Sequence, residues 1–182
     1  MPPLKALLFA IVASLGFLVL PAQTDDGANK QQRAQGYYTL KKILDQESNL
    51  SKVLIIKDPK TGIENFMKRV SEVSGKYNNE LDQWFKQDPS LVAKSDGFPP
   101  IERKARNGIE SATTKSMLLT GDKNFEVRVL VSQIQATDYL RNTFEALEET
   151  ETSEKRKGRL KAGKEDYEKL MGEAYQLLGA KK

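Results

Sequence analysis

The sequence contains neither cysteine nor histidine in its 182 residues. Without cysteine the chain has no disulfide, no thiolate zinc site and no cysteine nucleophile. Without histidine it lacks the commonest metal ligand of proteins and their commonest general base. These absences exclude Ser-His-Asp triads, HExxH zinc sites and histidine-containing di-iron sites. We therefore expect no enzyme, no cofactor, and no catalytic, cofactor-binding or metal-binding residue.

Long apolar runs are also scarce, and the one that stands out covers residues 6–20, near the N-terminus. Lys5 precedes it, and Pro21 and Ala22 follow it. About 15 apolar residues suit the hydrophobic region of a signal peptide and fall short of the roughly 20 that span a membrane. The pattern predicts a signal peptide over residues 1–22 and a secreted or periplasmic protein. A retained N-terminal anchor is the alternative.

The excess of positive over negative charge is small: 29 basic and 25 acidic residues give a net charge of +4. This balance slightly favours anionic partners and does not have the strongly basic character of nucleic-acid-binding proteins. Residues 23–36 are polar, and we expect a flexible leader there. Residues 37–180 are long enough for one helical domain with a single core.

Apolar residues recur at helical spacing through most of this domain, most regularly from Ile63 to Trp84. Val53 to Ile56 could instead form a short strand, but no partner strand is evident. Asp58-Pro59 and Pro100 are typical of helix starts, and the long connection 88–100 separates two helices. The expected helices cover residues 37–56, 58–84, 100–120, 124–147 and the stretch from Thr152 or Ser153 onwards.

Five helices of this kind predict an all-α fold, a four-helix bundle with one additional helix, up-and-down where connections are short. Apolar faces would meet in one core, and their burial would hold the helices together. The expected core comprises Leu40, Leu44, Phe66, Val70, Val73, Tyr77, Leu81, Trp84, Ile109, Leu130, Ile134, Phe144, Leu160, Leu170 and Leu177.

Several polar groups are candidate sites. Gln133 lies among apolar neighbours, close to Gln135, Asp138, Tyr139 and Arg141. A buried amide needs hydrogen-bond partners, so Gln133 predicts a structural hydrogen bond between helices; the alternative is a polar pocket.

Carboxylates offer a possible cation site if two or more face inward. Nearly all lie off the apolar stripes, which favours solvated faces, and Glu126 lies closest to buried positions. The candidate carboxylates are Glu64, Glu72, Glu80, Glu102, Glu110, Glu126 and Glu145.

A basic run and a loop complete the candidates. The run indicates an exposed, internally paired helix face, or else a surface for phospholipid head groups or another envelope polyanion. It comprises Lys155, Arg156, Lys157, Arg159, Lys161 and Lys164. In the loop 94–100, Phe98 either closes one end of the bundle or serves as a docking element.

The stretch FEVRVLVSQIQATDYL (residues 125–140), the short acidic turn after it, and the spacing of Tyr167, Leu170, Ala174 and Leu178 carry a resemblance. They resemble the last two helices of the ferritin-like bundles of exported bacterial proteins. The resemblance implies a ferritin-like helical bundle. Members of that class often carry histidines in these helices, and this chain has none.

These observations predict a non-enzymatic binding module of the cell envelope that contacts an unidentified protein or an anionic envelope component through a helix face or the 88–100 loop. We expect no nucleic-acid partner, and no membrane span once the signal is cleaved. The alternative is a ferritin-like remnant that binds a divalent cation through carboxylates.

Overall fold

A computed structural model describes residues 26–119 and 121–180; the predicted signal peptide lies outside these residues. The described residues are helical and contain no strand, which confirms the all-α prediction. None of the described helices combines the length and apolar character that crossing a membrane requires. The elements are α1 (Asp26–Glu47), η1 (Leu50–Ile55), α2 (Thr61–Gln87), η2 (Pro89–Leu91), α3 (Pro100–Leu119), α4 (Asp122–Thr150) and α5 (Glu154–Gly179).

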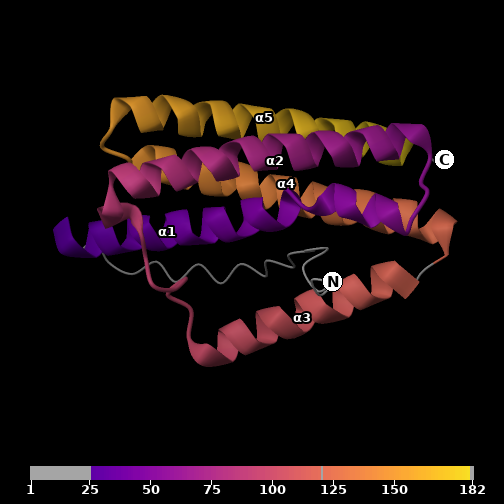
Figure 1. Cartoon of the computed structure of the whole chain (residues 1–182), viewed down its shortest axis with the longest axis horizontal. Helices are drawn as coiled ribbons and strands as arrows, with labels where there is room; N and C mark the ends of the chain where they lie inside the picture. The colour runs from indigo at the N-terminus through magenta and orange to yellow at the C-terminus, as the bar shows by residue number, and fades with distance from the viewer. Residues whose placement is uncertain (1–25, 120, 181–182) are drawn as a thin grey trace.

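Four of the helices lie side by side, and α3 crosses apart from them (Figure 1). Helix α1 packs on α2 and α4, and α5 packs on α4 and α2, so the four helices enclose a common core. We call α1, α2, α4 and α5 the helical body. Within it α1 and α2 are antiparallel, as are α4 and α5, while α2 and α4 run in the same direction because α3 returns the chain between them (Figure 1).

The core of the helical body agrees with most of the sequence prediction. Ten expected residues are buried: Leu40, Leu44, Phe66, Val70, Tyr77, Leu81, Leu130, Phe144, Leu160 and Leu170. Val73, Trp84, Ile134 and Leu177 are partly buried and pack against them. At the centre, the rings of Tyr77 and Phe144 lie edge to face, 5.1 Å between centroids, and Phe144 stacks on Tyr167 at 5.5 Å. Such aromatic pairs add to the stabilisation from burial.

The first helix differs from the prediction at both ends. It begins at Asp26, so most of the stretch expected as a flexible leader over 23–36 is helical. Residues 28–35 are mainly good helix formers, Ala34 is buried, and the Arg33 guanidinium donates to the Thr150 carbonyl at 2.9 Å. The helix ends at Glu47, and Leu50–Ile55 form a 3₁₀ helix where a continued helix was expected and a strand was the alternative.

The boundaries of the later helices agree only in part with the local signals. Helix α2 starts at Thr61 rather than at Asp58-Pro59, and the Lys60 N–H just before it donates to the Glu126 carboxylate of α4 at 2.7 Å. Helix α4 continues three residues past Leu147 despite its C-terminal acids. Helix α5 begins where expected, with the Ser153 hydroxyl accepting from the Arg156 N–H.

Helix α3 contradicts one core prediction. Ile109 was expected in the core and is 42 % exposed. It shares one stripe with Ile101, Ala105, Ala112 and Leu119, and every member of that stripe is exposed. The amphipathic pattern correctly defined an apolar side of the helix, but that side faces away from the core.

Candidate binding site

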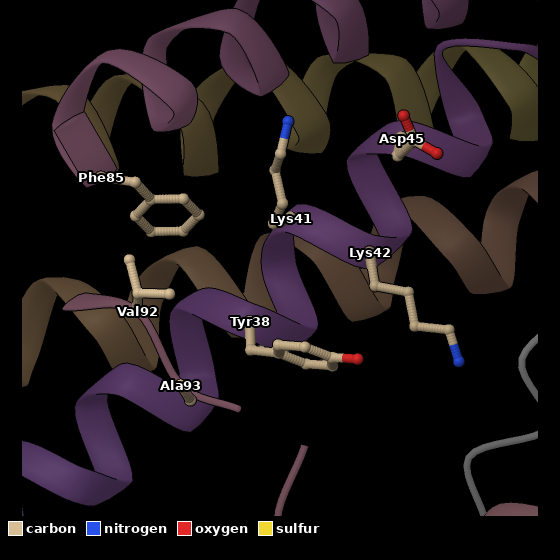
Figure 2. Close-up of a pocket in the computed structure, with 7 residues that line it drawn as sticks. All are labelled: Tyr38, Lys41, Lys42, Asp45, Phe85, Val92 and Ala93. Carbon is tan, nitrogen blue, oxygen red and sulfur yellow. The ribbon is translucent and has the colours of Figure 1, made fainter. Parts of the chain in front are cut away.

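A surface pocket of about 260 Å³ lies between α1 and the segment that follows α2 (Figure 2). Tyr38, Lys41, Lys42 and Asp45 line it from successive turns of α1. Phe85 comes from the end of α2, and Val92 and Ala93 come from the connection to α3. We call this the first pocket. Figure 2 shows Phe85 and Val92 facing each other beside α1, so the pocket has one apolar wall.

Charge in the first pocket is concentrated on α1. The Lys41 ammonium pairs with Asp82 at 2.7 Å and donates to the Asn78 carbonyl at 3.4 Å. Lys42 lies near Glu110 of α3; burial raises the pKa of Glu110, and the charge of Lys42 lowers it by less. The pocket therefore presents apolar surface with two lysines on its α1 side, a combination that suits a molecule with both an apolar part and an anionic group.

A second pocket of about 380 Å³ adjoins the first and shares Val92 and Ala93 with it. Its other lining residues are Lys30, Gln31, Ala34, Gln35, Ser90, Lys94 and Ser95. Together the two pockets are lined by four lysines and one aspartate. Each volume is close to the lower end of the range for small-ligand sites, roughly 300–1,000 Å³.

The pocket wall after α2 is held by a buried junction centred on Glu151, in the turn between α4 and α5. The Glu151 carboxylate accepts from the Tyr37 hydroxyl at 2.5 Å and from the Arg156 guanidinium at 2.9 Å. Arg156 also pairs with Asp88 at 3.2 Å, and Asp88 caps η2 by accepting from the Ser90 N–H. Burial would raise the pKa of Glu151, but the hydrogen bonds from Arg156 and Tyr37 outweigh it and hold the pKa at about 2.

Gly97 fixes the far end of the same connection. Its φ is +78°, in the left-handed region that glycine adopts without a steric penalty. A Cβ atom there would lie 2.7 Å from the Gln35 side chain, which lines the second pocket. Any other residue at position 97 would adopt a strained φ and would require the end of the Gln35 side chain to move.

Phe98 does not close the end of the core, which was one of the two roles expected for it. Its ring is half-buried outside the core and lies under the Arg106 guanidinium of α3, 4.1 Å from centroid to Cζ. The Asp96 carboxylate accepts from the Phe98 N–H at 3.1 Å and pairs with Arg103. These contacts with Arg103 and Arg106 hold the end of the loop against the start of α3.

Gln133 makes the predicted structural hydrogen bond. It is fully buried, and its Nε2 donates to the Glu47 carboxylate of α1 at 2.9 Å. Burial raises the pKa of Glu47 to about 7, and the hydrogen bond from Gln133 lowers it by less. The other members of this predicted group do not join the pair: Arg141 bonds Asp138, Gln135 is exposed, and Tyr139 is half-buried.

The predicted carboxylates are dispersed among basic and amide partners. Glu64 pairs with Lys68, Glu80 with Arg159, and Glu102 with Arg106. Glu126, the most buried of them, accepts from the Lys60 backbone. Over the described ranges no group of three or more histidine, cysteine, aspartate or glutamate residues is placed to hold a metal ion.

The basic run on α5 is partly directed into the helical body. Arg156 binds Glu151 and Asp88, and Arg159 pairs with Glu80 at 2.5 Å beside the Tyr77 ring. Lys164 pairs with Glu145 of α4. Lys155 and Lys161 remain exposed, so the run does not form one continuous basic surface.

The sequence indicated the 88–100 connection as a candidate contact segment, but it did not indicate the residues of α1 that face it. Tyr38 and Lys42 lie beside the apolar stripe of their helix and carry no motif. Only the approach of Val92 and Ala93 gives them a shared role. No model of a known protein family matches the chain, and neither does any curated protein or solved structure.

Proposed function

We propose that this protein is a non-enzymatic binding module of the cell envelope that accommodates an anionic amphipathic molecule in the first pocket. The observation that carries the proposal is the apolar wall of Phe85, Val92 and Ala93 next to Lys41 and Lys42. An acyl or aromatic group would pack on the wall, and a carboxylate or phosphate would reach the lysines. The export pattern of residues 1–22 supports a secreted or periplasmic location.

Within this proposal α1, α2, α4 and α5 form the up-and-down, ferritin-like bundle that the resemblance implies, and α3 is the additional helix. The neighbouring pairs of the helical body support this arrangement. The alternative of a carboxylate-bound cation has no comparable support, because the predicted acids bind lysine, arginine and backbone groups instead.

The test uses Trp84, the single tryptophan of the chain, as a natural reporter beside Phe85. Its ring lies edge to face with Tyr37 at 6.1 Å. The full chain is titrated with decanoate while Trp84 emission is followed, and decanol provides the matched uncharged molecule. We expect a saturable change with decanoate and a weaker one with decanol.

Two variants then locate the binding. Ala93→Phe fills the pocket and should weaken decanoate binding about tenfold. Val131→Phe places a phenylalanine at an exposed valine of α4 and should leave binding unchanged. Lys42→Gln should reduce the preference for decanoate over decanol. Equal affinity in the Ala93 variant would show that the first pocket is not the binding site. Equal affinity for the two molecules would show that the lysines do not recognise an anionic group.

A further inference from the structure

Helix α3 turns its apolar side away from the rest of the molecule. Ile101 and Leu119 are 80 % and 79 % exposed, and Ile109 is 42 % exposed. With Ala105 and Ala112 they recur at spacings of four, four, three and seven residues, so they form one stripe along the helix. An apolar stripe of this length exposed to water is unfavourable and indicates a contact surface.

The opposite side of α3 is polar and faces the helical body. The Glu110 carboxylate, on this side, accepts from the Gln46 amide of α1 at 3.2 Å. Arg106 pairs with Glu102 and covers Phe98. These bonds orient the helix, and its outward apolar stripe is a consequence of that orientation.

Charge is distributed unevenly around the stripe. Lys104 and Lys115 are exposed and lie eleven positions apart, about three helical turns, along the same edge of the stripe. The acids Glu102 and Glu110 lie on the other side, where Arg106 and Gln46 bind them. The outward side of α3 is therefore apolar along its middle and cationic along one edge.

We propose that α3 lies flat on an anionic membrane surface, with its apolar stripe among the acyl chains and its lysines at the level of the head groups. This is the geometry of an interfacial amphipathic helix. Twenty residues give a helix about 30 Å long, enough for a stable line of contact with the bilayer. The surface is separate from both pockets, and the proposal does not depend on the proposed function.

A second copy of the chain fits the stripe less well. In a symmetric antiparallel pair of helices, each edge of one helix meets the same edge of the other. Lys104 and Lys115 would then face the lysines of the second copy, which is repulsive. Anionic lipid head groups place opposite charge beside both lysines.

The absence of cysteine makes a direct test possible. Ala112→Cys carries a nitrobenzoxadiazole label on the stripe of the full chain, and Glu168→Cys carries the same label on the exposed side of α5 as the matched control. Both are mixed with vesicles of equal amounts of phosphatidylglycerol and phosphatidylcholine, and with pure phosphatidylcholine. The label reports only the surroundings of position 112. Binding of the protein to vesicles through residues 6–20 alone would therefore not shift its emission.

With phosphatidylglycerol vesicles we expect a blue shift at position 112 and quenching by quenchers placed on the acyl chains, without either effect at position 168. Adding Lys104→Gln and Lys115→Gln should raise the lipid concentration needed for the shift about tenfold. A label at 112 that stays exposed to water overturns the proposal. A label at 112 that is already shielded without vesicles also overturns the proposal. Shielding that depends on protein concentration would assign the stripe to a second copy of the chain. Shielding that does not depend on concentration would assign it to the N-terminal segment. Equal shifts with both lipids would overturn the role of the lysines.

Discussion

Glu47 is a buried carboxyl group whose protonation affects the stability of the fold. It sits at the end of α1, almost without exposure, and accepts its hydrogen bond from a neutral amide. Burial in apolar surroundings disfavours the charged form of a carboxyl group, which is why its pKa lies at about 7. Gln133 Oε1 on the other side of the pair is buried without a hydrogen-bond partner among the described residues. The site therefore favours a neutral group at position 47.

This arrangement predicts how stability depends on pH. The pKa of Glu47 rises from 4.5 when unfolded to about 7 when folded, so its contribution is fully present below about pH 4.5 and is lost as the pH rises through 7. The lost free energy is roughly 3 kcal/mol. Glu47→Gln removes this dependence and lets the new amide donate to Gln133 Oε1. Urea unfolding at pH 5 and pH 8 measures the effect.

The comparison for this variant is Glu72→Gln, at an exposed position of α2. Glu72→Gln should keep the loss of stability between the two pH values, whereas Glu47→Gln should be more stable than the unmodified protein at pH 8. If Glu47→Gln lost as much stability as the unmodified protein between pH 5 and pH 8, the buried carboxyl would not control this part of the pH dependence.

At the scale of the elements, one close contact between α4 and α5 depends on a missing side chain. Gly163 of α5 lies against the Phe144 ring, and a Cβ atom there would be 2.5 Å from ring carbon Cε1. Phe144 cannot retreat easily, because Tyr77 and Tyr167 pack on it. Close packing of this kind leaves no space for an added methyl group.

Two glycine-to-alanine substitutions in α5 distinguish the steric effect of this contact from the effect of helix propensity. Alanine in place of glycine favours a helix by about 0.5–1 kcal/mol. Gly172→Ala should stabilise by that amount, because nothing lies within 4 Å of its Cβ position. Gly163→Ala should destabilise by about 1–3 kcal/mol, because overpacking outweighs propensity. Thermal and urea unfolding of both variants measure the difference; equal effects would mean that α4 and α5 are not in close contact at Gly163.

Element positions could be predicted from the sequence because they depend on local periodicity, as the stripe from Ile63 to Trp84 shows. The direction in which each stripe faces could not be predicted from the sequence. Ile109 belongs to a regular apolar stripe, yet bonds such as Gln46 to Glu110 turn it outward. The first pocket is hidden for a related reason, since Tyr38 and Val92 meet only after the chain has folded.

At the scale of the whole molecule, α3 is attached less firmly than the helices of the body. Met117 is the one buried residue among those of α3 whose burial is described. Regions with few buried apolar contacts open at lower free-energy cost than the core. We expect the amide protection factors in α3 to be lower than those in the middle of α2 by a factor of about ten or greater. Hydrogen exchange followed by mass spectrometry measures this, and equal protection would show that α3 opens together with the helical body.

The junction at Glu151 links two distant properties of the molecule. Arg156 connects the α4–α5 turn to Asp88, and the segment from Asp88 leads directly into Val92 and Ala93. Under the proposed function, binding in the pocket and closure of the turn would therefore be coupled, and such coupling is reciprocal. A molecule bound beside Val92 would make the turn harder to open, and a change at Arg156 would alter affinity in a pocket that Arg156 does not line.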